Sequence, residues 1–307
     1  MSPECGGLYN AWFMENAPRA FRESRERTGQ EVAATLTATG NLTNLGPEVL
    51  RRSPKCLQTL RMCTCPPLAR DRLVGLSGAS KGLVSRMEID GALPTGLPDG
   101  RLDAELRKLA RTIERLVDTG IFFWLESVPL SRPTDADVAR AATVVADRLC
   151  GALADPIIRN AQERRQLAGI GRWLDERGYR YLKTAKFDQM PAGTYGFRVN
   201  LPVVVADGSD EFVHIPVDVA VQPRGRRKNG LPVCIEAKSA GDFTNVNKRR
   251  KEEAQKMAQL RRTHGASIEY LLFLCGYFDG GYLGYEAAEG IDWVWEHRID
   301  DLTECGL

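Results

Sequence analysis

The stretch FVHIPVDVAVQPRGRRKNGLPVCIEAKSA, from Phe212 to Ala240, decides the fold of this chain. Two runs rich in Val and Ile flank a basic segment that ends in Asn229-Gly230, a dipeptide typical of hairpin turns. We therefore predict two β-strands joined by a turn. Because side chains alternate between the faces of a strand, Asp218, Glu236 and Lys238 fall on the faces opposite the apolar ones. The apolar face of the first strand is predicted to hold Val213, Ile215, Val217, Val219 and Val221.

The charged side chains of this hairpin converge on one cleft if both apolar faces pack on the same core. Two carboxylates can hold Mg²⁺, which prefers oxygen ligands, and a neighbouring lysine can assist an attacking water. The arrangement resembles the catalytic core of the PD-(D/E)XK nuclease superfamily, with Asp218 as the first acid and Glu236-Ala237-Lys238 as the ExK element. One departure is that Val217 separates Pro216 from Asp218. An acidic-x-Lys triplet also arises by chance, so a purely structural hairpin is the alternative.

The composition is that of a soluble globular protein, since 43% of the 307 residues are hydrophobic and 27% are charged. This length allows one large or two modest domains. No apolar run approaches membrane-spanning length and the N-terminus lacks a signal-peptide pattern, so we expect a cytoplasmic protein. The eight cysteines are scattered, which fits reduced thiols. Buried free thiols are favoured over a zinc site for the irregularly spaced Cys56, Cys63 and Cys65.

The predicted fold class is α/β (α+β), with a mostly helical N-terminal region followed by a PD-(D/E)XK-type mixed β-sheet core flanked by helices. We expect residues 1–150 to recognise DNA and residues 151–307 to form a restriction-endonuclease-like catalytic domain. Predicted helices cover Ala17–Ala38, Pro47–Leu60, Leu102–Asp118 and Thr134–Leu153. A separate helix is predicted to begin at Asp155-Pro156, because proline fits a first turn, and to end before Gly178.

One segment of the helical region, DRLVGLSGASKGLVSRMEIDG from Asp71 to Gly91, resembles the helix-turn-helix of bacterial repressors. Gly78 would make the turn and Ser80 would cap the second helix. Three side chains would face the core: Leu83, Val84 and Met87. The exposed face would carry the residues that read DNA: Lys81, Ser85 and Arg86. A plain helical hairpin inside an α domain is the alternative.

From Tyr179 onward the pattern changes to strands. They are predicted at Arg180–Lys186, Gly196–Ala206, Phe212–Gln222, Leu231–Ser239 and Ile268–Tyr277. A helix predicted at Asn245–Thr263 connects the last two strands, which should therefore be parallel. The alternating Trp293 and Trp295 predict a late edge strand before a short C-terminal helix.

Basic side chains cluster around the predicted cleft, where they are placed to bind DNA phosphates. They are Arg226, Arg227 and Lys228 in the turn, and Lys248, Arg249 and Arg250 at the start of the crossover helix. A charged run is also typical of a solvated helix face. The helix before the sheet extends its apolar stripe to Glu163, which is a candidate auxiliary acid unless it simply reaches solvent.

Several longer segments together resemble the XamI family of Type II restriction endonucleases. They are CPPLARDRLVGLSGAS, IIRNAQERRQLAGIGRWLDERGY, IPVDVAVQP and LPVCIEAKSAGDFTNVNKRRKEEAQK. The resemblance implies Mg²⁺-dependent cleavage of double-stranded DNA at a short palindromic site, in a bacterium with a matching methyltransferase. Carried over by position, Asp218 and Glu236 would bind the metal, Lys238 would assist the water and Glu163 would be auxiliary. A palindromic site is matched most simply by a homodimer.

Two other functions fit parts of the sequence. A repair or recombination nuclease of the same superfamily would share the catalytic core but would cut at a DNA structure or a lesion. A transcriptional regulator using the helix-turn-helix segment would bind DNA without cutting it.

Overall fold

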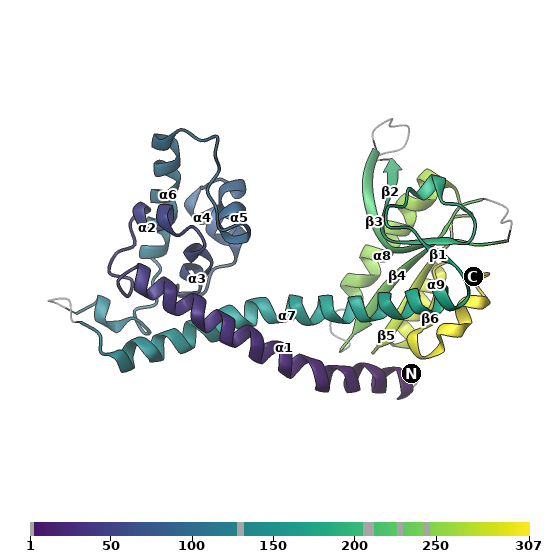
Figure 1. Cartoon of the computed structure of the whole chain (residues 1–307), viewed down its shortest axis with the longest axis horizontal. Coiled ribbons are helices and arrows are strands. Elements are labelled where there is room, and N and C mark those ends of the chain that lie inside the picture. The colour runs from purple at the N-terminus through teal and green to yellow at the C-terminus, as the bar shows by residue number, and fades with distance from the viewer. Residues whose placement is uncertain (1–2, 128–131, 205–211, 226–229, 242–245) are drawn as a thin grey trace. The chain divides into compact units, whose positions relative to one another are not determined.

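The computed structural model describes residues 3–127, 132–204, 212–225, 230–241 and 246–307. The chain divides into two compact units: Arg19–Ile157, and Met1–Pro18 together with Ile158–Leu307. The division falls inside two long helices, α1 (Pro3–Ala38) and α7 (Asp135–Glu176), so each helix contributes to both units (Figure 1). The assignment of DNA recognition to residues 1–150 and of catalysis to residues 151–307 stays a prediction.

The unit Arg19–Ile157 is built from helices around one apolar core. Besides parts of α1 and α7, it contains α2 (Pro47–Arg52), α3 (Cys56–Met62), α4 (Arg70–Ser77), α5 (Lys81–Ile89), α6 (Asp99–Glu114) and the short 3₁₀ helix η1 (Phe123–Leu125). Helix α6 shows why these segments are helical, because its apolar residues recur at helical spacing and are all buried: Leu102, Leu106, Leu109 and Ile113. Cys56 and Cys63 are buried free thiols here, and Cys65 is exposed.

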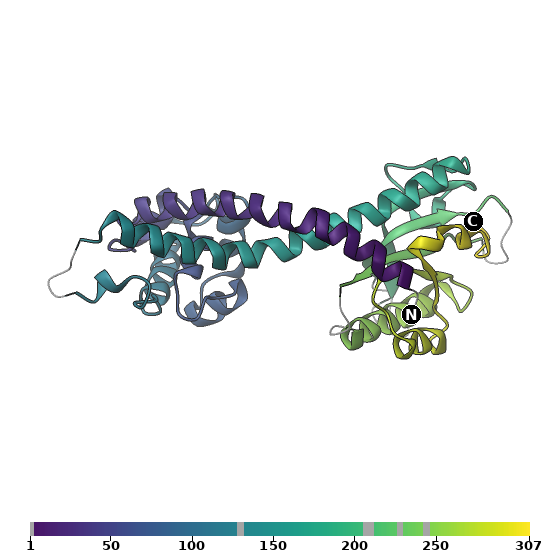
Figure 2. The ribbon, with the colours of Figure 1, turned by 90° about the horizontal axis from the view of Figure 1, so that it is seen from below.

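Helices α1 and α7 lie side by side within this unit, as Figure 2 shows. Arg25 Nη2 of α1 lies 2.6 Å from Asp147 Oδ1 of α7. The hydroxyl of Thr28, which is fully buried, donates to the carbonyl oxygen of Ala146 at 3.3 Å. These contacts join two segments that are more than a hundred residues apart in the chain.

The predicted break at Asp155-Pro156 is wrong, since α7 runs without interruption from Asp135 to Glu176 with Pro156 inside it. Proline removes one backbone hydrogen bond and strains an interior turn. Burial on both sides outweighs this cost, because Leu149 is buried before the proline and Ile170 after it. The predicted end is confirmed: Gly178 adopts a φ of +73°, a conformation that favours glycine after a helix.

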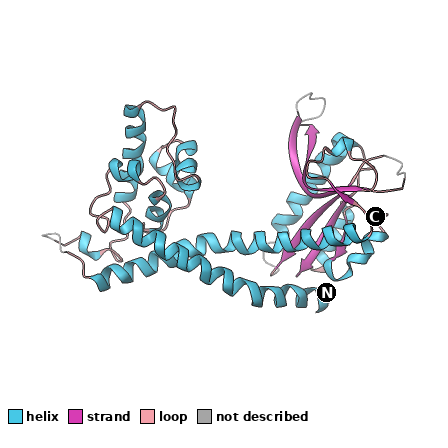
Figure 3. Ribbon diagram, in the orientation of Figure 1, coloured by secondary structure: helices cyan, strands magenta, loops and turns pink. Residues whose placement is uncertain are grey.

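The second unit holds a mixed sheet, drawn in magenta in Figure 3. Its strands in the described residues are β1 (Arg180–Tyr181), β2 (Thr194–Val204), β3 (Phe212–Gln222), β4 (Val233–Ala240), β5 (Tyr270–Gly276) and β6 (Asp292–Trp295), side by side in chain order. The pairs β2–β3 and β3–β4 are antiparallel, and the other neighbouring pairs are parallel. Helix α8 (Val246–His264) crosses from β4 to β5, so the predicted crossover and parallel pairing are confirmed.

The sheet carries an apolar core on each face. The α7 core includes Ile170, Leu174, Val219, Ile235 and Phe273. The core beneath α8 and α9 (Gly280–Ala288), called the α8–α9 core, includes Cys234, Met257, Leu260, Leu272 and Tyr282. Since side chains alternate along β4, Glu236 and Lys238 share the face of Cys234 and therefore lie toward α8.

The predicted apolar face of β3 is partly wrong. Val219 packs in the α7 core, but Val217 packs in the α8–α9 core, and Val213 is exposed. The change of face falls at Asp218, directly opposite Arg198 of β2, whose φ is +50°. A left-handed residue inside a strand kinks it and interrupts the strict alternation of side chains.

Other differences are at the edges of the sheet. The strand predicted at Arg180–Lys186 is only β1, and the 3₁₀ helix η2 (Phe187–Gln189) follows it. Helix α9 was not predicted. The predicted edge strand at Trp293 and Trp295 is β6, and the C-terminal helix is the 3₁₀ segment η3 (Glu296–Thr303). Within the described residues, no helix is both long and apolar enough to cross a membrane.

Candidate active site

The ladder between β3 and β4 ends where the two candidate acids begin. Its last registered pair is Val219 with Ile235, so one further step would place Asp218 opposite Glu236. Instead, the backbone N–H of Ala237 donates to Asp218 Oδ2 at 2.8 Å. A carboxylate thus takes the place of a strand partner, and both acids lie at the point where β3 and β4 stop pairing.

Lys238 lies between two carboxylates. Its Nζ atom is 3.2 Å from Glu236 Oε1 and 2.7 Å from Glu253 Oε1. The second oxygen of Glu236 is 2.7 Å from Lys256 Nζ, and the second oxygen of Glu253 accepts a hydrogen bond of 2.6 Å from the Tyr270 hydroxyl. The predicted convergence of Glu236 and Lys238 is therefore extended by groups from α8 and β5.

Sequence reasoning did not single out Glu253, Lys256 or Tyr270 as members of this site. The signal was present in α8, because Glu253, Lys256, Met257 and Leu260 follow one another at helical spacing along the buried side. A carboxylate on the apolar stripe of a helix needs a partner, and in a crossover helix that partner lies on the sheet. Glu253 has only 3% of its side chain exposed, so Lys238 and Tyr270 are what satisfy it.

The charges of the site act strongly on one another. Burial, followed by the charge of Glu236, raises the pKa of Asp218 to about 6. Burial also favours a raised pKa for Glu236, but the Lys238 and Lys256 ammonium groups outweigh it and lower the pKa of Glu236. Burial opposes the charged form of Lys238, yet the carboxylates of Glu236 and Glu253 outweigh it and raise the pKa of Lys238. Lys238 is therefore an ammonium group, whereas ionised Asp218 is costly until a cation lies beside it.

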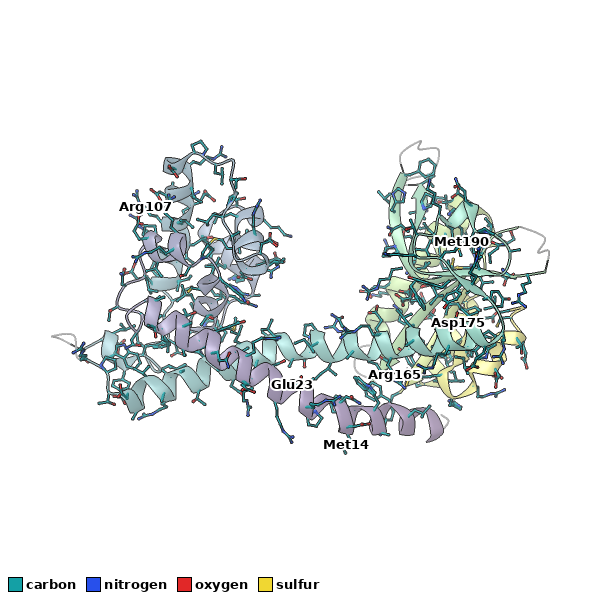
Figure 4. The ribbon with its side chains drawn as sticks, viewed as in Figure 1. Met14, Glu23, Arg107, Arg165, Asp175 and Met190 are labelled. Atoms are coloured by element: carbon teal, nitrogen blue, oxygen red, sulfur yellow. The ribbon has the colours of Figure 1, made fainter. Side chains whose placement is uncertain are left out.

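Helix α7 positions the candidate auxiliary acid. Tyr195 of β2 donates to Asp175 Oδ1 at 2.9 Å, and Arg165 Nη2 lies 2.7 Å from Glu296 Oε2; Figure 4 shows Arg165 and Asp175 on α7. Just before these anchors along α7, Glu163 Oε1 lies 2.9 Å from Arg198 Nη2 of β2, and the charge of Glu163 contributes to the raised pKa of Asp218. Glu163 therefore belongs to the electrostatic surroundings of the site, while its direct partner is Arg198.

The donor set at the ends of β3 and β4 fits a hard divalent cation. Asp218 and Glu236 offer carboxylate oxygens, and Mg²⁺ retains several of its waters, so two protein carboxylates suffice. A bound cation would also relieve the repulsion that raises the pKa of Asp218. In the part of the chain that the structure describes, no cluster of three or more metal-ligating side chains is formed. Glu163, the candidate third acid, is held by Arg198.

The predicted phosphate-binding residues lie largely where the structure gives no side chains. Arg226, Arg227 and Lys228 lie outside the described residues. Lys248, Arg249 and Arg250 lie in the first turns of α8, but their side chains are outside the described part. Their role stays a prediction.

The helix-turn-helix segment forms the two expected helices, α4 and α5. Gly78 ends α4 with a φ of +63°, and the three predicted core residues of α5 are buried: Leu83, Val84 and Met87. Lys81 and Arg86 are exposed, and Ser85 is half-buried. Ser80 stands at the N-cap, but its side chain makes no capping bond; its backbone N–H instead donates to Glu105 Oε2 at 2.7 Å. DNA reading by this pair of helices stays a prediction.

Comparison with known proteins adds an independent finding. The model of the XamI restriction endonuclease family matches residues 40–295 of this chain. The Type II restriction enzyme SalI from Streptomyces albus G is 53% identical over 302 residues, which cover 97% of this chain and 94% of that enzyme. No solved structure matches this chain.

Proposed function

The chain belongs to the XamI restriction endonuclease family, and from this premise we propose that it hydrolyses double-stranded DNA at a short palindromic site, with Asp218, Glu236 and Lys238 as its catalytic residues. The observation that carries this assignment is the meeting of these three side chains at the end of the β3–β4 ladder. Family membership gives the restriction endonuclease activity, and the geometry supports this location for it.

Type II restriction endonucleases generally need a divalent metal, and we propose Mg²⁺ held by Asp218 and Glu236. When bound, Mg²⁺ supplies charge neutralisation at the phosphate and favours ionisation of a water. Asp218 and Glu236 lie on adjacent strands, one residue beyond the last registered pair of the ladder, and this placement supports a joint role for them as ligands. Glu163 is the proposed auxiliary acid.

Lys238 is proposed to act on the attacking water and on the phosphate. Glu236 and Glu253 hold its ammonium group, which has three N–H donors in total. An ammonium group so held orients a water and faces the negative charge that develops on the phosphate. We favour this role over proton acceptance by Lys238, because two carboxylates stabilise its charged form. The attacking water gives up one proton to solvent, its oxygen bonds to phosphorus, the bond to the 3′ oxygen breaks, and solvent protonates that leaving oxygen.

We propose that the enzyme acts as a homodimer, with one active site for each strand of the palindrome. The proposed biological partner is a DNA methyltransferase that protects the same site in the host. The basic residues of the β3–β4 turn and of α8 are proposed to bind phosphates, and α5 to contact bases. The repair nuclease and the non-cleaving regulator are not favoured, because the matching family consists of restriction endonucleases.

Digestion of a sequenced plasmid tests this function. With Mg²⁺, we expect discrete linear fragments whose mapped ends share one short palindrome, and no cleavage in EDTA. A smear, or nicked circles only, would indicate a nuclease that reads structure or damage instead. Lasting integrity of bound plasmid in Mg²⁺ would contradict the proposal.

A further inference from the structure

Arg198 has an unusual backbone at a position that faces the first acid of the site. The β2–β3 ladder pairs Phe197 with Val219 and Val199 with Val217, so Arg198 and Asp218 occupy the facing positions between them. The φ of Arg198 is +50°, a backbone conformation that residues other than glycine seldom adopt. Residues with such strained backbones cluster at functional sites.

The kink at Arg198 changes where neighbouring side chains point. Phe197 packs against the α7 core, and Val199 packs in the α8–α9 core. Arg198 itself stays out of both cores, with 64% of its side chain exposed. The kinked backbone therefore serves packing through its neighbours, but the Arg198 side chain does not, because it buries little apolar surface and extends toward solvent beside two acids.

The guanidinium of Arg198 pairs with the carboxylate of Glu163 on α7, with Nη2 2.9 Å from Oε1. Ion pairs between exposed groups contribute little free energy, so this one is easily exchanged. A phosphate also offers two oxygens that a guanidinium can hold by two parallel charge-assisted hydrogen bonds, as a carboxylate does. The Arg198–Glu163 pair is thus suited to being replaced by the backbone of a nucleic acid.

We propose that Arg198 binds a phosphate of the DNA strand that is cut, and that Glu163 holds its guanidinium in place until that phosphate replaces the carboxylate. The exchange releases the Glu163 carboxylate near Asp218, where it becomes available as the auxiliary acid of the site. This inference rests on the proposed function, because it takes the Asp218–Glu236 site as the place of cleavage.

A simpler role for Arg198 is to neutralise Glu163 and so to reduce repulsion between the site and DNA. The two roles differ in a double variant. If Arg198 only neutralises Glu163, removing both charges together restores the affinity of the unmodified enzyme. If Arg198 contacts a phosphate, the double variant stays weak, because the guanidinium–phosphate bond is still missing.

The experiment measures affinity for a duplex containing the mapped cleavage site, in EDTA so that no cutting occurs, for Arg198→Gln, Glu163→Gln and the double variant. Arg298→Gln is the matched control, because Arg298 pairs with Asp301 in η3 much as Arg198 pairs with Glu163. The Arg298 side chain is 60% exposed, and the Asp301 side chain is 30% exposed, as is that of Glu163. We expect Arg198→Gln and the double variant to bind about tenfold more weakly, as loss of one charge-assisted bond predicts. We expect Glu163→Gln to bind at least as tightly as the unmodified enzyme.

Salt dependence supplies a second readout that a structural role would not move. Loss of one phosphate contact lowers the slope of log affinity against log salt by about 0.9. Wild-type affinity in the double variant, or Arg198→Gln indistinguishable from Arg298→Gln, would overturn the proposal. Failure of the proposed function is seen separately, as absence of site-specific cleavage by the unmodified enzyme in Mg²⁺.

Discussion

The Nζ atom of Lys238 lies 2.7 Å from Oε1 of Glu253, a carboxylate whose side chain is only 3% exposed. Glu253 comes from α8 and Lys238 from β4, so the helix that follows the strand fixes the lysine that the strand presents. Because an ion pair with one buried partner has a defined geometry, the orientation of Lys238 depends on Glu253 as well as on its own strand.

Glu253→Gln should therefore slow cleavage while Tyr270→Phe should not. The glutamine keeps the shape of the side chain but removes the charge that holds the Lys238 ammonium group, and misplacing a group at the attacking water costs a factor of about 10². Tyr270→Phe keeps the Lys238–Glu253 pair and removes only the hydroxyl that donates to Glu253. Single-turnover cleavage of a cognate duplex at saturating Mg²⁺, well below the melting temperature of each variant, measures the difference. Equal rates for the two variants would show that Glu253 does not position Lys238.

Removing either proposed metal ligand should abolish cleavage and leave DNA binding intact. Asp218→Ala and Glu236→Ala each delete one carboxylate of the site, and losing repulsion toward phosphate should strengthen binding in EDTA. The control is Asp292→Ala, an exposed carboxylate at the start of β6 in the same sheet. Cleavage assays paired with binding titrations check this, and a near-normal rate in either ligand variant would exclude that residue from the site.

The stability of the metal-free protein should depend on pH through Asp218. Its folded-state pKa of about 6 lies above the ordinary 3.8, so protonated Asp218 stabilises the fold at low pH, and this contribution is lost as the pH rises through 6. Asp218→Asn stays neutral at every pH, so its advantage over the unmodified protein should be small near pH 4.5 and roughly 1–3 kcal/mol at pH 8. Urea unfolding in EDTA at both pH values measures it. An advantage that does not change with pH would contradict the raised pKa.

Arg86→Gln in α5 should weaken binding to the cognate site more than binding to unrelated DNA. A side chain that contacts a base edge contributes about 1–3 kcal/mol of discrimination, whereas a phosphate contact weakens all sequences alike. Lys81→Gln should behave in the same way. Arg107→Gln is the control, because Arg107 is exposed on α6 of the same unit, where Figure 4 labels it. An unchanged ratio of the two affinities would favour the plain helical hairpin.

Glu88→Gln should destabilise the helical unit. The Glu88 side chain is fully buried at the end of α5, with Oε1 2.5 Å from Arg61 Nε and Oε2 2.8 Å from Arg70 Nε. Removing one partner of a buried ion pair leaves charge uncompensated and costs about 3–5 kcal/mol. Urea unfolding of the variant against Glu114→Gln, an exposed residue of α6, measures the effect. A loss no greater than that of the control would show that packing alone holds α5.

The sequence predicted the β3–β4 hairpin and the α8 crossover because their signals are local. A turn dipeptide between two runs rich in Val and Ile indicates the antiparallel pairing of β3 with β4, and a charged helix between two apolar strands indicates the parallel pairing of β4 with β5. The prediction failed where long-range contacts decide. Pro156 looked like a helix start because its immediate neighbours permit one, whereas burial far on either side keeps α7 continuous.

The site shows the same division. Glu236 and Lys238 follow from one strand, and their meeting with Asp218 follows from hairpin pairing. Arg198 could not be found this way, because an arginine in an alternating strand gives no sign of a left-handed backbone. The pairing of Lys238 with Glu253 of α8 depends on how that helix is rotated about its axis over the sheet. The spacing of residues along the helix narrows the possible rotations but does not select one.

The β4–α8–β5 crossover also bears on the order in which the enzyme becomes competent. Glu236, Lys238, Glu253, Lys256 and Tyr270 all lie between residues 236 and 270, so their contacts close short loops and should form early during folding. The hydrogen bond from the Ala237 N–H to Asp218 spans 19 residues and belongs to the same early group. The pair of Arg198 with Glu163 spans 35 residues, so Glu163 should be positioned after the two carboxylates and the lysine. An assembled Asp218–Glu236–Lys238 set is therefore no sign that the rest of the enzyme has folded, which makes cleavage a stricter reporter of complete folding than binding of a cation.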